Sequence, residues 1–233
     1  MIMKQRGKFI VIEGVDGSGK ATQVRLLEDF LKEKIGNDKL LVTAFPRYYS
    51  SEWGKLVGEF LSGKFGELKD VSPYLATLTY MLDQYTWSRD IGRKWIENGG
   101  WVLSDRYFTS NVHQIAKLKT RAKSDFRKWI WKMGWDELGL LKPDLVLFLD
   151  RSPVDSSKLN KTKNDRAYIK GKKRDIAERD FSHQLNSYRE YLRTVKDNSG
   201  WWMSIPCVTT GDIGGDTILI QERIRKVIEK RLL

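Results

Sequence analysis

The fold of this chain is decided by its residues 8–20, KFIVIEGVDGSGK. The apolar run at residues 8–13 predicts a short buried strand. Residues 14–20 then fit the pattern G-x-x-x-x-G-K, and the apolar spacing of residues 22–34 predicts a helix. Glycines let the backbone wrap around phosphate groups with its N–H groups pointing inward, and the helix N-terminus adds free donors. The stretch therefore predicts a phosphate-binding loop between a strand and a helix.

The predicted loop indicates a site for the phosphates of ATP, with one departure from the usual pattern. Lys20 is long enough to reach the β- and γ-phosphates. The pattern normally continues with a Ser or Thr whose hydroxyl ligates Mg²⁺, but the next residue here is Ala21. Thr22 faces another side of the helix, so we expect Mg²⁺ to be held by water, phosphates and a carboxylate. The residues predicted to hold the phosphates are Gly14, Val15, Asp16, Gly17, Ser18, Gly19, Lys20, Ala21 and Thr22.

Beyond this loop, short apolar runs alternate with helical patterns. Such alternation predicts an α/β fold in which helices cover both faces of a parallel sheet, and ligands bind such sheets beyond the carboxyl ends of the strands. The three most suggestive loops follow Glu13, Phe45 and Ser104, so we expect all three at one rim of the sheet. The predicted strands are residues 8–13, 40–45, 101–104, 144–149 and 202–206, and the predicted helices are residues 22–34, 71–95, 181–195 and 217–232.

Length and composition predict one domain over residues 1–233. The chain is 40% hydrophobic and has neither a Pro/Ser-rich linker nor a repeat of fixed period. No apolar run approaches the roughly 18 residues that span a bilayer, and no signal peptide is recognisable, so we expect a cytoplasmic protein without a membrane partner. The single cysteine, Cys207, excludes an internal disulfide. The net charge of +12 favours anionic partners such as nucleotides or nucleic acid without choosing among them.

Four motifs together resemble the thymidylate kinases, and the resemblance covers nearly the full chain. They are GVDGSGKATQ at residues 14–23, FPRY at residues 45–48, DRY at residues 105–107 with Ser110-Asn111 behind it, and the basic residues 165–174. The first motif alone indicates only a P-loop, whereas the ordered set is specific to that family. The resemblance implies a P-loop NTPase fold with a five-stranded parallel sheet, a mobile lid at about residues 157–176, and a homodimer. The implied reaction is the Mg²⁺-dependent transfer of phosphate from ATP to dTMP, which forms dTDP on the way to dTTP.

Two residues directly after the third predicted strand suit a phosphate and a metal. Phosphoryl transfer between two anions needs charge neutralisation and alignment. Arg106 offers a planar fork that suits a phosphate, and the resemblance implies the acceptor phosphate; a surface ion pair is the alternative. Asp105 is placed for Mg²⁺ or its water shell, with a role in the turn as the alternative. Asp16 suits a sugar hydroxyl or, more weakly, Mg²⁺, and the resemblance implies the 3′-hydroxyl of deoxyribose.

The acceptor base is expected to meet aromatic rings and an amide. The resemblance implies that Phe45 and Tyr80 line the thymine, although either could equally belong to the core. Asn111 can donate and accept, as thymine N3–H and O4 require. Gln84 stands where the family usually has an arginine that donates to a base oxygen, so it offers a neutral donor on a shorter arm. The residues expected to bind dTMP are Asp16, Phe45, Arg47, Tyr48, Tyr80, Gln84, Arg106 and Asn111.

Two further segments carry many charges. Residues 157–179 are poor in apolar side chains, which predicts a mobile flap. Some thymidylate kinases carry a catalytic arginine in the phosphate loop and others carry it in the lid. Because this loop has none, we expect Arg166 or Arg174 to join Lys20, Asp105 and Arg106 as catalytic residues. The basic residues 117–139, which include three tryptophans, predict either a dimer face or a helix packed on the domain.

Three functions compete. The first is an ATP-dependent phosphotransferase that acts on dTMP. The second is a kinase of the same fold for another (deoxy)nucleotide or a deoxynucleoside, which Gln84 favours. The third is a nucleotide- or nucleic-acid-binding module with little catalysis, which Ala21 and the positive charge favour. Because the basic residues form no recognised nucleic-acid motif, and because a binding module would leave Asp105 and Arg106 without a purpose, we expect the enzyme.

Overall fold

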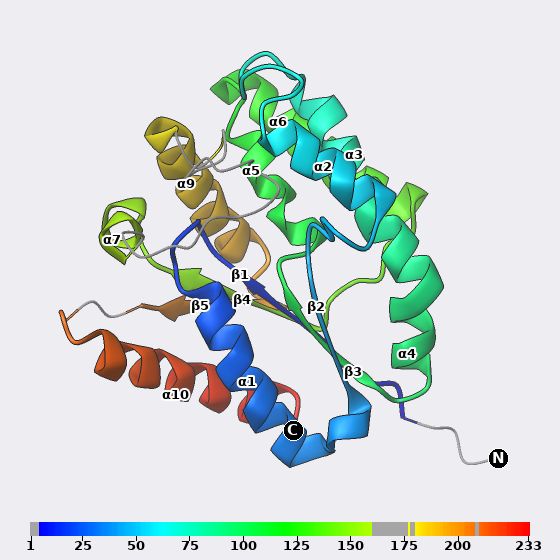
Figure 1. Ribbon diagram of the computed structural model, residues 1–233, viewed down its shortest axis with the longest axis vertical. Helices are drawn as coiled ribbons and strands as arrows, with labels where there is room; N and C mark the ends of the chain where they lie inside the picture. Colours follow the sequence, from blue (N-terminus) through cyan, green and yellow to red (C-terminus); the bar gives the residue numbers. More distant parts are fainter. Residues whose placement is uncertain (1–4, 160–176, 178–179, 208–209) are drawn as a thin grey trace.

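The computed structural model describes residues 5–159, 177, 180–207 and 210–233, and these contain one five-stranded sheet (Figure 1). All neighbouring strands run parallel, in the order β2-β3-β1-β4-β5. The predicted α/β fold is confirmed, and each predicted strand ends within one residue of the observed strand. The strands are β1 (Phe9–Glu13), β2 (Leu40–Ala44), β3 (Trp101–Asp105), β4 (Leu145–Asp150) and β5 (Trp202–Pro206).

One face of the sheet is covered by two helices, α1 (Lys20–Ile35) and α10 (Ile213–Arg231) (Figure 1). Ile10 and Ile12 of the central strand β1 point to this face, where they are fully buried in an aliphatic core. Because α1 begins at the last residue of the phosphate loop, this core fixes the loop against the sheet.

The opposite face carries a larger core that is rich in aromatic rings. Phe9 and Val11, the alternate residues of β1, are fully buried there, as the two-residue period of a strand requires. The rings of Trp87 and Tyr107 pack against Phe9 with centroid distances of 5.6 and 4.9 Å. The helices that contribute to this core are α3 (Pro73–Trp87), α4 (Arg93–Glu97), α5 (Val112–Ile115), α6 (Thr120–Trp131) and α9 (Phe181–Asp197).

The predicted helix at residues 71–95 is confirmed, but it is interrupted by a turn of π-helix. Pro73 opens α3 in its first turn, where the missing backbone N–H costs nothing. The π-helical turn η2 (Ser88–Gly92) then leads directly into α4. A Cβ atom on Gly92 would lie 2.5 Å from the Trp87 ring, so glycine lets that ring pack against the backbone of the turn. The sequence pattern predicted the extent of this helix but not its irregular middle.

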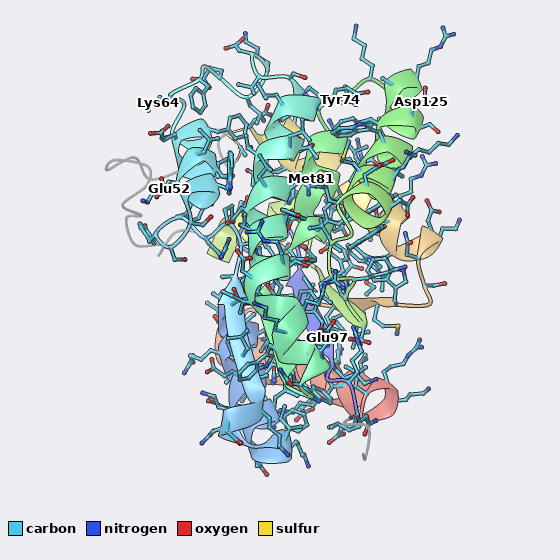
Figure 2. All side chains as sticks on the ribbon, turned by 90° about the vertical axis from the view of Figure 1, so that its right-hand side faces the viewer. Glu52, Lys64, Tyr74, Met81, Glu97 and Asp125 are labelled. Carbon is cyan, nitrogen blue, oxygen red and sulfur yellow. The ribbon has the colours of Figure 1, made fainter. Side chains whose placement is uncertain are left out.

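Helices α2 (Glu52–Leu61) and α7 (Pro153–Leu159) were not predicted from the sequence. Helix α2 buries Val57 and Phe60 in a third core that it shares with α3, and Figure 2 shows α3 between α2 and α6. Helix α7 includes residues 157–159, where the predicted flap begins. The rest of the predicted lid, residues 160–176, lies outside the described residues. The remaining short elements are η1 (Asn37–Lys39), η3 (Phe108–Asn111) and η4 (Lys132–Glu137).

The tryptophan-rich residues 117–139 form α6 and the π-helical turn η4, and both pack on the domain. Trp131 and Trp135 stack on each other, and both meet the buried ring of Phe108 edge to face. These two rings therefore belong to the intramolecular core. Among the described residues, no helix is both long and apolar enough to cross a bilayer.

Candidate active site

A cavity of about 860 Å³ lies where β1, β2 and β3 end. The segments that follow these strands meet there, as expected for a parallel sheet. The cavity is closed on its other sides by residues of α9 and α10, including His183 and Thr217. The predicted site residues that line it are Asp16, Gly17, Ser18, Gly19, Lys20, Ala21, Thr22, Phe45, Arg47, Tyr48, Tyr80, Asp105, Arg106 and Asn111.

The phosphate loop depends on glycine at three positions for different reasons. Gly17 and Gly19 have φ angles of 79° and 96°, which non-glycine residues rarely adopt. A Cβ atom on Gly14 would lie 2.5 Å from the Ser18 hydroxyl, whereas one on Gly19 would meet no atom within 4 Å. The loop is therefore tight at its start and open at Gly19. Val15 contributes only its backbone to the loop, because its side chain is fully buried in the aromatic core.

Lys20 is buried at the start of α1 and is held by its own loop. Its Nζ donates to the carbonyl oxygens of Gly14 and Val15 at 3.1 and 3.0 Å. Burial lowers the pKa of Lys20 to about 8, and the positive charge of Arg106 contributes to the decrease. The ammonium group is thus only partly compensated by backbone dipoles, and anionic phosphate oxygens would be much stronger partners.

Arg106 forms an ion pair with the aspartate of the phosphate loop. Its Nη2 donates to Asp16 Oδ1 at 2.6 Å, and its Nη1 lies 3.3 Å from His113 Nε2 and 3.4 Å from the Ser110 hydroxyl. Asp16 also accepts from the Gln184 side chain at 3.2 Å. Burial alone would lower the pKa of Arg106, but Asp16 and other nearby anions raise it well above the ordinary value. The sequence predicted both Asp16 and Arg106 as ligand-binding residues, and the structure adds that they bind each other.

Asp105 has an acceptor atom that the described part of the chain leaves unused. Its Oδ1 is buried and receives no hydrogen bond from any described residue. The residue lines the same cavity as Ala21, which has no hydroxyl group. A buried carboxylate oxygen without a donor is the kind of group that a hard cation or its water shell satisfies. The described residues contain no cluster of three or more metal-ligating side chains, so phosphate oxygens and water would have to supply the other ligands.

Arg47 is held by a buried carboxylate that the sequence analysis did not consider. Its Nε donates to Asp83 Oδ1 at 2.9 Å, and its Nη2 donates to the Asp83 carbonyl and the Thr86 hydroxyl. The backbone N–H of Arg47 donates to Asp83 Oδ2, so one carboxylate fixes both the backbone and the side chain. Among the described residues, Nη1 has no hydrogen-bond partner, and the side chain lines the cavity. This end of the guanidinium remains available to an anion.

The predicted base-binding residues fall into two groups. Asn111, Phe45 and Tyr80 line the cavity, although Phe45 also packs edge to face on Trp87 and is only 5% exposed. Gln84 is not among the lining residues; it lies behind Asn111 and accepts from its side-chain amide at 3.5 Å. The same amide donates to the Phe108 carbonyl at 2.9 Å. The amide nitrogen of Asn111 therefore points into the protein, which leaves its oxygen as an acceptor for a ligand.

Comparison with known proteins now identifies the family. The sequence model described as "Thymidylate kinase" matches residues 12–208, which include the phosphate loop and the cavity residues that follow β2 and β3. The chain belongs to the thymidylate kinase family. It is 31% identical to the thymidylate kinase of Homo sapiens over 233 residues, which cover 98% of this chain and 96% of the human one. It is also 31% identical to a probable thymidylate kinase of Staphylothermus marinus over 164 residues, 70% of this chain and 73% of that relative.

The fold is likewise that of solved members of the thymidylate kinase family. The structure of thymidylate kinase from Candida albicans superposes with a TM-score of 0.69 at 22% sequence identity, covering 97% of this chain and 92% of that one. At this identity the likeness supports the fold alone. The predicted membership of the family is confirmed, whereas the roles of individual residues rest on the geometry of the cavity.

Several residues at this site were not predicted from the sequence. The chain has only two histidines, His113 and His183, and both line the cavity with ring centroids 6.2 Å apart. Burial lowers the pKa of both rings, that of His183 to about 4. Gln184 approaches Asp16 from a position 168 residues away, and no local pattern announces such a contact. Arg151, which follows β4, also lines the cavity.

The predicted lid arginines, Arg166 and Arg174, lie outside the described residues. The catalytic role expected for one of them therefore stays a prediction. The described end of the preceding segment is the helix α7, and Ala177, on the far side of the gap, lines the cavity and accepts from the Gln184 side chain at 3.0 Å.

Proposed function

We propose that this chain transfers the γ-phosphoryl group of ATP to dTMP and forms dTDP and ADP. The observation that carries the proposal is the cavity itself, in which the phosphate loop faces the residues that follow β2 and β3. Two anionic substrates can meet there beside cationic side chains of Lys20, Arg47 and Arg106. Catalysis of phosphoryl transfer consists mainly of such positioning and charge neutralisation. Membership of the thymidylate kinase family supports the same acceptor.

On the donor side, the phosphate loop fits the phosphates of ATP. Gly19 opens toward the cavity, and the following helix presents unpaired N–H groups at its start. Lys20 would exchange the carbonyl oxygens of Gly14 and Val15 for phosphate oxygens. Asp105, with its unused buried Oδ1, would hold Mg²⁺ or one of its water molecules. When bound, Mg²⁺ supplies positive charge that neutralises the phosphate oxygens.

On the acceptor side, Arg106 and Arg47 would bind the monophosphate from two directions. Asp16 would accept from the 3′-hydroxyl of the sugar, which fits a carboxylate that now accepts from Arg106 and Gln184. Phe45 and Tyr80 would line the base. Arg106 and Asp16 would each exchange a partner that is already present in the protein. Arg47 would instead add its Nη1, which has no hydrogen-bond partner among the described residues.

The orientation of Asn111 supports selection of the base. Its side-chain nitrogen is committed to Phe108 and Gln84, so its oxygen is the atom that a base would meet. An acceptor oxygen complements the N3–H of thymine or uracil and opposes N3 of cytosine, which is itself an acceptor. Asn111 would therefore favour dTMP and dUMP over dCMP, and Gln84 would act by fixing the Asn111 amide.

We further propose a homodimer through the outer face of α3. Leu75 and Leu78 are 59% and 36% exposed on this helix, and Tyr74 and Ile91 extend the apolar face. Figure 2 shows α3 at the front of this side of the molecule, with Tyr74 near its start. Sedimentation of the wild-type chain should give the mass of a dimer, and Leu78→Glu should give that of a monomer. A wild-type monomer at micromolar concentration would contradict this arrangement.

Two parts of the proposal rest on the sequence alone. The phosphate loop contains no arginine, so Arg166 or Arg174 of the lid would supply the additional positive charge near the transferred phosphate. A location in the cytoplasm and a single domain over residues 1–233 are likewise proposed from the sequence. Both statements are independent of the cavity geometry.

The proposal is tested by the release of ADP from ATP–Mg²⁺ with dTMP, dUMP, dCMP, dGMP, UMP and thymidine as acceptors. We expect dTMP to be preferred, with dUMP second, and Lys20→Ala to be inactive at an unchanged far-ultraviolet circular dichroism spectrum. Preference for another acceptor would reassign the base pocket while keeping the kinase. Folded wild-type protein that binds ATP but uses none of these acceptors would overturn the proposed function.

A further inference from the structure

Glu13, the last residue of β1, is a fully buried carboxylate that is not among the residues lining the cavity. It directly precedes the phosphate loop, yet it contacts the acceptor side of the site. Burial raises the pKa of Glu13, which shows that the protein environment disfavours its charge. A buried ionisable group is costly to folding, so its retention calls for a role beyond packing.

Three hydroxyl groups from two different elements converge on this carboxylate. Thr109 of η3 donates to Oε1 at 2.6 Å, and Tyr191 of α9 donates to Oε2 at 2.8 Å. Ser110, also of η3, lies within 3.0 Å of both oxygens. Glu13 therefore ties the end of β1 to the turn that follows Arg106 and to the helix that supplies Gln184.

The same network reaches one end of the Arg106 guanidinium. Ser110 lies between the two groups, since its hydroxyl contacts Glu13 and accepts from Arg106 Nη1 at 3.4 Å. Nη1 itself lies 3.9 Å from Glu13 Oε2. The other end, Nη2, instead donates to Asp16, a residue that lines the cavity. The two ends of one guanidinium thus have different partners: Nη1 meets Ser110 and His113 close to the buried Glu13, and Nη2 meets Asp16.

The backbone of Arg106 also needs support. Its φ angle of 64° lies in the left-handed region, which is unusual for a residue with a side chain. Its N–H donates to the Ile12 carbonyl at 3.0 Å, and its own carbonyl accepts from the Ser104 hydroxyl. Such a conformation persists only where neighbouring groups fix it. The contacts with Ile12 and Glu13 both come from the end of β1.

We propose that Glu13 is a positioning residue for phosphoryl transfer, which fixes the Nη1 end of Arg106 through Ser110 while the Nη2 end exchanges Asp16 for the acceptor. This inference rests on the proposed role of Arg106 at the acceptor phosphate. The guanidinium then needs no large rearrangement when dTMP binds, because one edge stays in place and the other changes partner. Fixed donors of this kind stabilise developing charge better than mobile ones.

The test is a double-mutant cycle of Glu13→Gln and Arg106→Ala. Glutamine keeps the shape of Glu13 but has one acceptor oxygen, so it cannot accept from Thr109 on one side and from Ser110 and Tyr191 on the other. We expect Glu13→Gln to lower kcat/KM for dTMP by about 10- to 100-fold and to change KM for ATP less than about twofold. In the Arg106→Ala background, Glu13→Gln should lower kcat/KM for dTMP by less than about threefold. Equal losses in both backgrounds would overturn the proposal.

A matched control separates positioning from stability. Thr109→Val removes the hydroxyl on Oε1 but leaves Ser110 between Glu13 and Arg106. We expect it to lower the melting temperature and to keep kcat/KM for dTMP within about twofold of wild type. If Glu13→Gln does not fold, Ser110→Ala takes its place, because it removes the intervening hydroxyl. If Glu13→Gln, or Ser110→Ala in its place, loses stability but keeps kcat/KM for dTMP, Glu13 has only a structural role.

A second readout does not depend on turnover. In ligand-free wild-type protein, the two Nη nitrogens of Arg106 should give separate NMR signals, because rotation about the Cζ–Nη bonds is restrained. The signals are assigned by their loss in Arg106→Lys. We expect them to average in Glu13→Gln and to stay separate in Thr109→Val. Averaged signals in the wild type would overturn the inference, whereas separate signals in a protein without kinase activity would overturn only the proposed function.

Discussion

Replacing Lys20 with methionine is expected to abolish turnover and yet stabilise the ligand-free protein. Methionine has a similar length, fits the buried start of α1, and carries no charge. The buried ammonium group of Lys20 contacts two backbone carbonyls and no carboxylate at hydrogen-bonding distance among the described residues. It is therefore expected to make the folded protein less stable than an apolar side chain would, and the role proposed for it is to bind phosphate.

The magnitude follows from the pKa of Lys20, which burial lowers from 10.5 to about 8. At about 1.4 kcal/mol for each pKa unit, the penalty is about 3 kcal/mol at neutral pH. The unfolded chain keeps its proton up to about pH 10.5 and the folded chain only to about pH 8, so the penalty is complete below pH 8 and disappears toward pH 10.5. Loss of two hydrogen bonds, each about 1 kcal/mol, offsets part of the gain.

Urea unfolding without nucleotide at pH 7, 8, 9 and 10 measures this effect, and release of ADP measures turnover. Lys20→Met should be about 1–3 kcal/mol more stable than wild type at pH 7, with a difference that shrinks as the pH rises. Lys226→Met, which changes an exposed lysine of α10, serves as the control and should change neither quantity. A Lys20→Met protein that is less stable than wild type at pH 7 would refute the reasoning about burial. Retained turnover would refute the phosphate-loop assignment.

Three further predictions concern single contacts. Arg106→Ala should raise KM for dTMP by about tenfold or more and KM for ATP by less than about threefold in steady-state kinetics; equal increases would remove it from the acceptor site. Ala21→Ser should lower the Mg²⁺ concentration for half-maximal activity, because it restores the hydroxyl ligand; an unchanged titration would mean that Asp105 and the phosphates suffice. Gln84→Leu should reduce the preference for dTMP over dCMP, because Asn111 loses one acceptor that fixes its amide; an unchanged ratio would mean that Phe108 alone holds it.

The sheet could be predicted from sequence because its strands are short, mostly apolar runs with abrupt ends. Each residue of β1 is buried, and its apolar run, Phe9 to Ile12, ends at Glu13, directly before Gly14 begins the loop. Helix α2 could not be predicted in this way. It contains Gly54 and Gly58, which disfavour helices, and its stability comes from packing Val57 and Phe60 on α3. A Cβ atom on Gly54 would lie 2.2 Å from the Arg47 carbonyl, so this glycine permits a contact between segments rather than a local structure.

Most of the residues predicted for the site line one cavity, but their pairings could not be predicted from the sequence. Asp16, Arg47 and Arg106 stand next to strand ends, and the parallel topology brings strand ends together. Their partners are different in kind: Asp83 lies on α3 and Gln184 on α9, each far along the chain. Neither contact has a local sequence pattern, because it depends on how a helix packs across the site. Gln84 shows the same limit, since the sequence placed it at the base and the structure places it behind Asn111.

These pairings have a consequence for substrate affinity. Lys20, Arg47 and Arg106 would each be an uncompensated buried cation in an empty site, and each instead has an internal partner: loop carbonyls, Asp83 or Asp16. At Lys20 and at the Nη2 end of Arg106 a phosphate must therefore replace these partners, whereas Nη1 of Arg47 is available to it among the described residues. Breaking a charged hydrogen bond such as Arg106–Asp16 costs about 1.5–3 kcal/mol of the binding free energy of the phosphate. This cost lowers its affinity roughly 10- to 100-fold unless Asp16 gains another donor. The sugar 3′-hydroxyl is such a donor. An acceptor without it should therefore bind more weakly through its phosphate as well as through its sugar. A 3′-deoxy analogue of dTMP should consequently bind more weakly to wild type, and this difference should shrink in Asp16→Asn, where the pairing with Arg106 is already weakened.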